Sequence, residues 1–295
     1  MLFSYITWDV NPEIFNILGI SLRYYGLLFV GGLITCGYVL GRIFKKEGIP
    51  QTHLEKLCIY GAIGVFVGAR LGHCLFYEPL YFLTHIDEML LPVKNLPDGS
   101  YKFIGYQGLA SHGGAIGLII AIMIYARKTK ESTLKTIDMM GLVAPLQGFF
   151  IRTANLMNSE IIGIETDKPW AFVFTNVDTV PRHPAQLYEA LCYISFFVVL
   201  ILLYRKKYLK LQTGAIFGLS LTLIFIARFF IEFIKERQVD FEETMKYDMG
   251  QLLSIPFILT GTGFIIYSIY CRKKGIVPAT VQQVSKRREK RNRKR

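Results

Sequence analysis

Seven long apolar stretches constrain this chain more than any other feature, because each is about as long as a helix that crosses a bilayer. They lie at about residues 18–41, 54–76, 109–126, 134–152, 186–204, 213–234 and 249–270 of the 295-residue chain. Only 19% of the residues are charged and the mean hydropathy is +0.35, whereas about a quarter are charged in a typical soluble domain. The sequence predicts an all-α polytopic membrane protein with seven transmembrane helices. This composition excludes intrinsic disorder, and five widely spaced cysteines exclude a disulfide scaffold.

The basic residues between the stretches predict their orientation. Of the 34 Lys and Arg residues, 23 lie in the intervals 42–56, 127–135 and 205–210 and in the tail 272–295. Seven lie on the opposite side, and four lie inside the stretches. The positive-inside rule therefore places the N-terminus outside and the C-terminus in the cytoplasm.

The apolar stretches and the intervals between them also predict the domain organisation. We expect residues 1–271 to form one transmembrane domain, with external inserts at about 77–108 and 153–185 that build a small external cap. The remainder, 272–295, is expected to be a basic cytoplasmic tail without fixed structure. The tail accounts for much of the net charge of +12, and it is expected to contact anionic lipid, at about 1 kcal/mol per basic residue. No nucleic-acid-binding module accompanies the charge, so nucleic acid is not an expected partner.

Ionisable residues occur inside the apolar stretches, where each costs about 2.5–3.5 kcal/mol to insert and so requires an explanation. Six of them are Arg23, Arg70, His112, Arg152, Arg228 and Glu232. In the predicted orientation all six lie toward the external face, although they come from different stretches. A guanidinium group suits a phosphate, and the phosphate of a membrane is a phospholipid headgroup.

Individually, these residues also have structural explanations. Arg228 and Glu232 are spaced i, i+4 and would neutralise each other, and Arg23 would extend to the headgroups. Arg70 would pair with a carboxylate, and His112 would be a buried, hydrogen-bonded histidine. Their shared depth favours an anion-binding site over a set of unrelated ion pairs.

Short motifs rich in glycine, arginine and asparagine recur near the outer ends of the stretches. They are LRYYG at 22–26, GARLG at 68–72, HGGAIG at 112–117, RTANLMNSE at 152–160 with Gly163, RHPAQLYE at 182–189, RFFIEF at 228–233 and MGQLLS at 249–254. In order and spacing, over about residues 20–270, they resemble those of the bacterial prolipoprotein diacylglyceryl transferases. Ala154 departs from the family pattern, which commonly has glycine there.

The resemblance implies an activity and a location. Enzymes of this family transfer the sn-1,2-diacylglyceryl group of phosphatidylglycerol to the lipobox cysteine of an exported prolipoprotein, in the bacterial inner membrane. The products are a thioether and glycerol 1-phosphate. We expect phosphatidylglycerol and the prolipoprotein as partners and no cofactor. We also expect no metal, since the sequence has no zinc-ligand spacing.

The resemblance and the chemistry together predict the site residues. The expected catalytic residues are His112, Arg152, Arg228 and Glu160; the expected substrate-binding residues are Tyr25, Arg70, Gly113, Gly114, Asn155, Asn158, Gly163 and Glu232; and the second-tier residues are Arg182, His183 and Gln186. The two catalytic arginines are expected to stabilise the phosphate, and Glu232 to orient Arg228. The proton acceptor for the thiol is either His112 or Glu160. Asn155 and Asn158 also have a structural explanation, as residues that end a helix.

Two other classes of protein would use the same arginines. A transporter or channel for an anionic solute predicts further polar residues at mid-depth and in the cytoplasmic half, and the sequence has few there. A lipid-binding scaffold predicts phosphatidylglycerol binding without release of glycerol phosphate.

Overall fold

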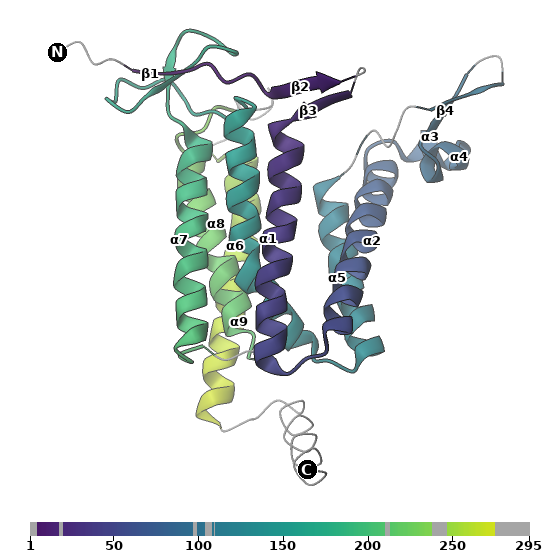
Figure 1. Ribbon diagram of the computed structural model, residues 1–295, viewed down its shortest axis with the longest axis vertical. Coiled ribbons are helices and arrows are strands. Elements are labelled where there is room, and N and C mark those ends of the chain that lie inside the picture. The colour runs from purple at the N-terminus through teal and green to yellow at the C-terminus, as the bar shows by residue number, and fades with distance from the viewer. Residues whose placement is uncertain are drawn as a thin grey trace. The chain divides into compact units, whose positions relative to one another are not determined.

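The computed structural model describes residues 5–17, 20–96, 99–103, 108, 110–209, 213–237 and 247–274, and within them the chain is mostly helical (Figure 1). The helices are α1 (Tyr24–Glu47), α2 (Gln51–Phe76), α3 (Pro79–Thr84), α4 (Ile86–Leu90), α5 (Ser111–Thr129), α6 (Thr133–Met157), α7 (Ala185–Arg205), α8 (Ala215–Glu232) and α9 (Met249–Lys273). The strands are β1 (Ile6–Trp8), β2 (Glu13–Ile17), β3 (Ile20–Arg23), β4 (Val93–Asn95), β5 (Tyr101–Phe103), β6 (Phe172–Phe174) and β7 (Pro181–Arg182).

The helical prediction is confirmed at each of the seven apolar stretches. Six of the described helices, α1, α2, α6, α7, α8 and α9, are long and apolar enough to cross a membrane. The third stretch is occupied by α5, a helix of 19 residues that begins with the polar sequence SHGG. The seventh span therefore stays a prediction. The basic tail from residue 275 onward lies outside the described residues.

The chain divides into two compact units. The first contains Met1–Arg42 and Ile137–Arg295, and the second contains Ile43–Thr136. The divisions fall within α1 and α6, so each unit contains part of both helices. The two external inserts belong to different units, and each contains small helices or strands of its own.

In the second unit, α2 and α5 pack closely through glycines. A side chain at Gly68 would collide with the carbonyl oxygen of Gly113, and one at Gly117 would collide with that of Gly64. Only glycine lets two helix backbones approach so closely, and such approach favours association within a membrane.

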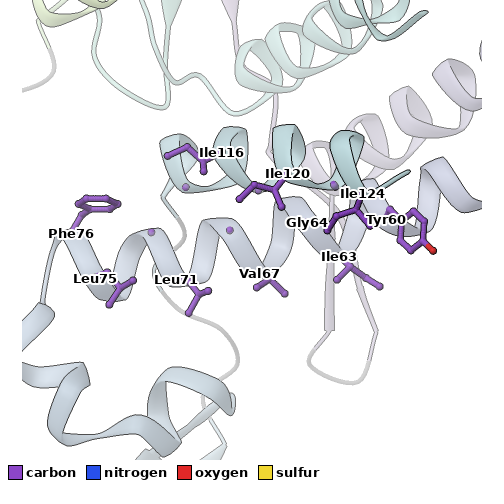
Figure 2. Close-up of a pocket in the computed structure, with 15 residues that line it drawn as sticks. Tyr60, Ile63, Gly64, Val67, Leu71, Leu75, Phe76, Ile116, Ile120 and Ile124 are labelled. Carbon is purple, nitrogen blue, oxygen red and sulfur yellow. The ribbon is translucent and has the colours of Figure 1, made fainter. Parts of the chain in front are cut away.

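Beside this contact, the two helices form an apolar groove of about 430 Å³. Figure 2 shows Ile63, Val67 and Leu71 projecting from α2, and Ile116 and Ile120 projecting from α5. The unit also contains the 77–108 insert, with α3, α4 and the antiparallel hairpin β4–β5. Several of its large apolar side chains are exposed, including Leu80 and Phe103, as expected for a segment at a membrane surface.

In the first unit, glycines again set the helix contacts. A side chain at Gly32 of α1 would meet Phe150 Cβ of α6 at 2.8 Å, and one at Gly218 of α8 would meet the carbonyl oxygen of Gly261 in α9 at 2.6 Å. Helix α7 packs against α8. The bundle thereby brings the end of α6 and the start of α7 together.

A small sheet covers that end of the bundle. Strand β6 pairs in parallel with β1 and antiparallel with β7. It packs Phe172 and Phe174 against Leu156 of α6. Trp8 joins this core and donates its indole N–H to the carbonyl oxygen of Leu156 at 3.0 Å. The sheet therefore fixes the last turn of α6.

The first apolar stretch begins as a strand, which the sequence analysis did not predict. Residues 20–23 form β3, which pairs with β2, and α1 begins only at Tyr24. Arg23 is therefore outside the helix, and its Nη2 lies 2.8 Å from Glu13 Oε1 on the neighbouring strand. Hydrogen bonds from Arg23 and Ser21 lower the pKa of the Glu13 carboxyl group. The charge of Arg23 is thus compensated by Glu13.

Candidate active site

A cavity of about 710 Å³ lies between the β2–β3 hairpin and the end of α6 in the first unit. One wall is formed by β3 and the start of α1, including Tyr25, and the other by the end of α6 and the residues that follow it. Three predicted site residues, Asn155, Asn158 and Glu160, line that second wall.

The carboxylate of Glu160 is held by both asparagines. Asn155 Nδ2 donates to Glu160 Oε1 at 2.8 Å, and Asn158 Nδ2 approaches the same oxygen at 3.4 Å. The backbone N–H of Glu160 also bonds to the carbonyl oxygen of Asn155 at 3.1 Å. Because Asn155 itself is buried, the carboxylate has a fixed position at the cavity wall.

The backbone on both sides of Glu160 is strained. Ser159 has a φ of 54° and Ile161 a φ of 61°, in the left-handed region that β-branched residues avoid. Such strain costs on the order of 1–3 kcal/mol per residue and persists where the surrounding structure imposes it. Here it accompanies the turn that presents Glu160 to the cavity.

Arg152 joins this wall to a buried set of charges. Its Nη1 donates to Asn155 Oδ1 at 3.0 Å, and its Nε contacts Glu189 Oε2. Glu189 is fully buried in α7, and its other oxygen lies 3.5 Å from Lys235 Nζ. Lys235 Nζ also lies 3.0 Å from Glu232 Oε2. Two carboxylates and two cations therefore alternate, so that each buried charge is compensated.

Arg228 lies near this set but is not paired within it. The charges of Arg228, Arg152 and Glu189 all act on the buried hydroxyl of Tyr193. Glu232 pairs with Lys235, not with Arg228 as the i, i+4 spacing suggested. Among the described residues, the side chain of Arg228 makes no ion pair or hydrogen bond.

Two of the second-tier residues, Arg182 and His183, lie at the end of strand β7 and directly after it. Arg182 donates to Asp178 Oδ2 from Nε and Nη2, at 2.9 and 2.7 Å, and these hydrogen bonds lower the pKa of the Asp178 carboxyl group. Its Nη1 lies 3.1 Å from Glu236 Oε1. His183 Nδ1 lies 3.1 Å from the Tyr188 hydroxyl, and burial lowers the pKa of the imidazole. Arg182 thus ties the insert to the residues after α8.

Gly163 and Gln186 have different environments. A side chain at Gly163 would meet the carbonyl oxygens of His183 and Ile234 at 2.6 Å, so this glycine serves close backbone packing. The side chain of Gln186 is fully buried, and within the described part of the chain its amide nitrogen and oxygen have no hydrogen-bond partner.

The other predicted site residues, Arg70, His112, Gly113 and Gly114, belong to the second unit. The guanidinium of Arg70 donates to the carbonyl oxygens of Glu88 and Met89, at 2.6 and 3.2 Å, and to that of Gly108 at 3.5 Å. It also lies 5.0 Å from the centre of the Phe82 ring. These three acceptors are backbone carbonyl oxygens, whereas the structural explanation considered for Arg70 was a carboxylate.

The remaining three lie at the start of α5. His112 is exposed. Gly113 packs against the backbone of Gly68 and Gly72, whereas a side chain at Gly114 would make only ordinary contacts of 3.5 Å or more. The two adjacent glycines therefore have different structural importance.

Glu189 and Lys235 were not predicted as site residues from the sequence. Glu189 is an ionisable residue inside an apolar helix, the same signal that identified Arg152. Lys235 follows Glu232 by three residues and was assigned only to the external side. Among the residues that the structure describes, no group of three or more His, Cys, Asp or Glu side chains has a geometry suited to a metal ion.

Comparison with known proteins finds the same family that the sequence motifs resemble. The family described as "Prolipoprotein diacylglyceryl transferase" matches residues 12–267. A protein of Bacteroides fragilis named "Phosphatidylglycerol--prolipoprotein diacylglyceryl transferase" is 52% identical over 271 residues, covering 92% of this chain and 97% of the relative. Proteins of the same name from Tolumonas auensis and Chloroherpeton thalassium are 43% and 40% identical, and they cover 88% and 90% of this chain and 96% and 95% of their own length.

Proposed function

This chain belongs to the prolipoprotein diacylglyceryl transferase family, and from that premise we propose how its residues act. It is a transferase of the membrane that carries out the first step of lipoprotein maturation. Its substrates are phosphatidylglycerol and a prolipoprotein, as the name of its relatives states.

The reaction is a substitution at carbon. The thiol of the lipobox cysteine gives up its proton, and the sulfur forms a bond to the sn-3 carbon of the diacylglyceryl group. The bond between that carbon and the phosphate oxygen breaks, and its electron pair stays with the phosphate, which leaves as glycerol 1-phosphate. Catalysis therefore requires stabilisation of the growing phosphate charge and removal of the thiol proton.

We assign Arg152 and Arg228 to the phosphate. The observation that carries this assignment is Arg228, a partly buried guanidinium without an anionic partner among the described residues. A buried cation without a counter-ion is unfavourable, and a phosphate would supply one. Arg152 is held rigidly by Asn155 and Glu189, which keeps its charge in place during the reaction.

Two residues are candidates for the proton acceptor. Glu160 lines the cavity with its carboxylate already fixed by Asn155 and Asn158, which favours it on geometry. His112 is exposed at the start of α5, and a histidine suits proton transfer near neutral pH. The pH dependence of kcat/KM in Glu160→Gln and His112→Gln variants decides between them, since only loss of the base removes the rise in rate with pH.

The other residues have supporting roles in this proposal. Tyr25, Asn155 and Asn158 shape the cavity for the headgroup and the peptide. Glu232 acts through Lys235, which compensates Glu189. Three further residues hold the surrounding structure, namely Arg182, Gly163 and Arg70.

We also propose seven spans, with α5 as the seventh, in the bacterial inner membrane. The 23 basic residues on one side support an external N-terminus and a cytoplasmic C-terminus. The basic tail then meets the anionic inner leaflet. The external face would hold the cavity, where exported prolipoproteins arrive.

Mass spectrometry of a lipobox peptide incubated with phosphatidylglycerol vesicles and the protein in detergent tests this function. The wild type is expected to add one diacylglyceryl group and release one glycerol phosphate. Arg152→Ala, Asn155→Ala and His112→Gln are expected to lower the rate, whereas Arg42→Gln, which changes an arginine that contacts Tyr38, is the matched control. If the three site variants fold and all keep the wild-type rate, the assignment is wrong.

A further inference from the structure

Strand β3 borders the cavity over three consecutive residues, Ser21, Leu22 and Arg23. Successive side chains of a strand point to opposite faces, so a cavity lined by three in a row must meet the strand at its edge as well as on one face. The side chains of Ser21 and Arg23 are already bonded to β2, through Asn16 at 2.9 Å and Glu13 at 2.8 Å. Besides the exposed side chain of Leu22, β3 presents its backbone to the cavity.

The backbone of β3 has one paired edge. Within the described residues its sheet contains only β2 and β3, so the second edge of β3 carries no strand. In an antiparallel pair, alternate residues direct their N–H and C=O groups away from the partner strand. Such an edge is a template for an extended peptide, which binds by adding a strand.

The position of β3 beside the cavity indicates which peptide would bind at its free edge. It faces the wall that holds Glu160, and it ends where α1 begins, at Tyr24 (Figure 1). A substrate thiol must enter this cavity, and an extended segment next to a membrane-spanning helix would meet β3 directly. The charge of Arg23 is compensated by Glu13, so the edge suits an uncharged segment.

We propose that the prolipoprotein segment around the reactive cysteine binds as a third strand along the free edge of β3. This inference rests on the proposed function and deepens it by naming the mode of peptide recognition. Backbone pairing fixes the register of the peptide, which places the thiol in the cavity whatever side chains flank it. It also explains why the hairpin precedes α1 where a longer helix was expected.

A scan of ester-substituted peptides tests the pairing. Each peptide replaces one amide N–H near the cysteine with an ester oxygen, which removes a hydrogen-bond donor without adding bulk. We expect kcat/KM to fall about fivefold to tenfold at alternate positions, mainly through KM, and to stay unchanged at the positions between them. A flat profile, or equal losses at adjacent positions, would overturn the proposal. Failure of the unmodified peptide to react would instead reject the proposed function.

Amide hydrogen exchange of the full-length protein gives an independent test. We expect the unmodified peptide to slow exchange in the segment that contains β3. Strand β1 is the matched control, because it also lies at the edge of its sheet but does not line the cavity. Protection of β1, or of neither strand, would contradict strand addition at β3.

Discussion

Arg70 in the second unit and Arg228 in the first are both arginines of apolar helices, yet their surroundings are opposite. The guanidinium of Arg70 is occupied by carbonyl oxygens from the insert that follows its helix. Arg228 has no acceptor among the described residues, and it lies near a buried set of alternating charges. An arginine inside a membrane helix is therefore not by itself an anion site. Whether it is free to bind an anion depends on whether acceptors of the protein already occupy its guanidinium group.

The largest loss of activity is expected from substitution of Arg152 in the first unit. We expect Arg152→Gln to lower kcat about 100- to 1000-fold, because it removes a charge from the leaving phosphate and leaves Glu189 with Lys235 alone. Arg152→Lys keeps the charge but not the two directed bonds, and it should retain part of the rate. The peptide transfer assay measures both. Equal rates for Gln and Lys variants would show that the charge is irrelevant.

The second-largest effect is a loss of stability in the second unit, where packing of glycines holds α2 against α5. Gly113→Ala would force α2 and α5 apart, at a cost of about 1–3 kcal/mol, whereas Gly114→Ala has room for its methyl group. Thermal unfolding in detergent should show a lower Tm for the first variant only. Similar Tm values for the two variants would contradict the close helix contact.

A third prediction concerns the strained turn beside Glu160. Ile161→Gly relieves the left-handed backbone and should leave Tm within a few degrees of wild type, yet lower kcat about tenfold by freeing Glu160. Ile161→Asn should restore most of the rate, since asparagine tolerates this conformation.

Lys207→Gly is the control for that prediction. Lys207 follows α7 in the same unit, does not line the cavity, and has a φ of 62°. The substitution relieves similar strain and should leave kcat unchanged. If Ile161→Gly also keeps the wild-type kcat, the strain does not serve to position Glu160.

The smallest effect is the acid sensitivity of the Asp178–Arg182 pair. Because the folded pKa of Asp178 is depressed below 3.8, its stabilisation is present above that pH and is lost as pH falls through the folded pKa. A partly exposed pair contributes about 1 kcal/mol or less. Tm measured from pH 5 to pH 2 should converge for wild type and Asp178→Asn. A constant difference would exclude the ion pair as its cause.

The sequence predicted the helices well because the length of an apolar stretch is local information. The expected spans at 186–204 and 249–270 agree closely with Ala185–Arg205 and Met249–Lys273. The prediction for the first stretch was wrong at its start, where Ile20–Arg23 forms a strand that pairs with Glu13–Ile17. Apolar composition alone does not separate a strand from a helix over four residues.

The site residues were predictable by type but not by partner. The Arg152–Glu189 contact joins residues 37 positions apart, and the acceptors of Arg70 lie 18, 19 and 38 positions away. Such partners depend on which helices pack together. An i, i+4 pair, in contrast, is visible in the sequence, and here it suggested Arg228–Glu232 where Glu232 instead contacts Lys235.

One paired measurement tests the contrast between the two arginines most directly: diacylglyceryl transfer by Arg228→Gln and Arg70→Gln, each expressed per folded molecule. We predict that Arg228→Gln loses at least 100-fold in rate with little change in Tm, whereas Arg70→Gln lowers Tm but keeps the rate of the folded protein within about threefold. A folded Arg228→Gln variant with the wild-type rate, or a stable Arg70→Gln variant without activity, would contradict the account.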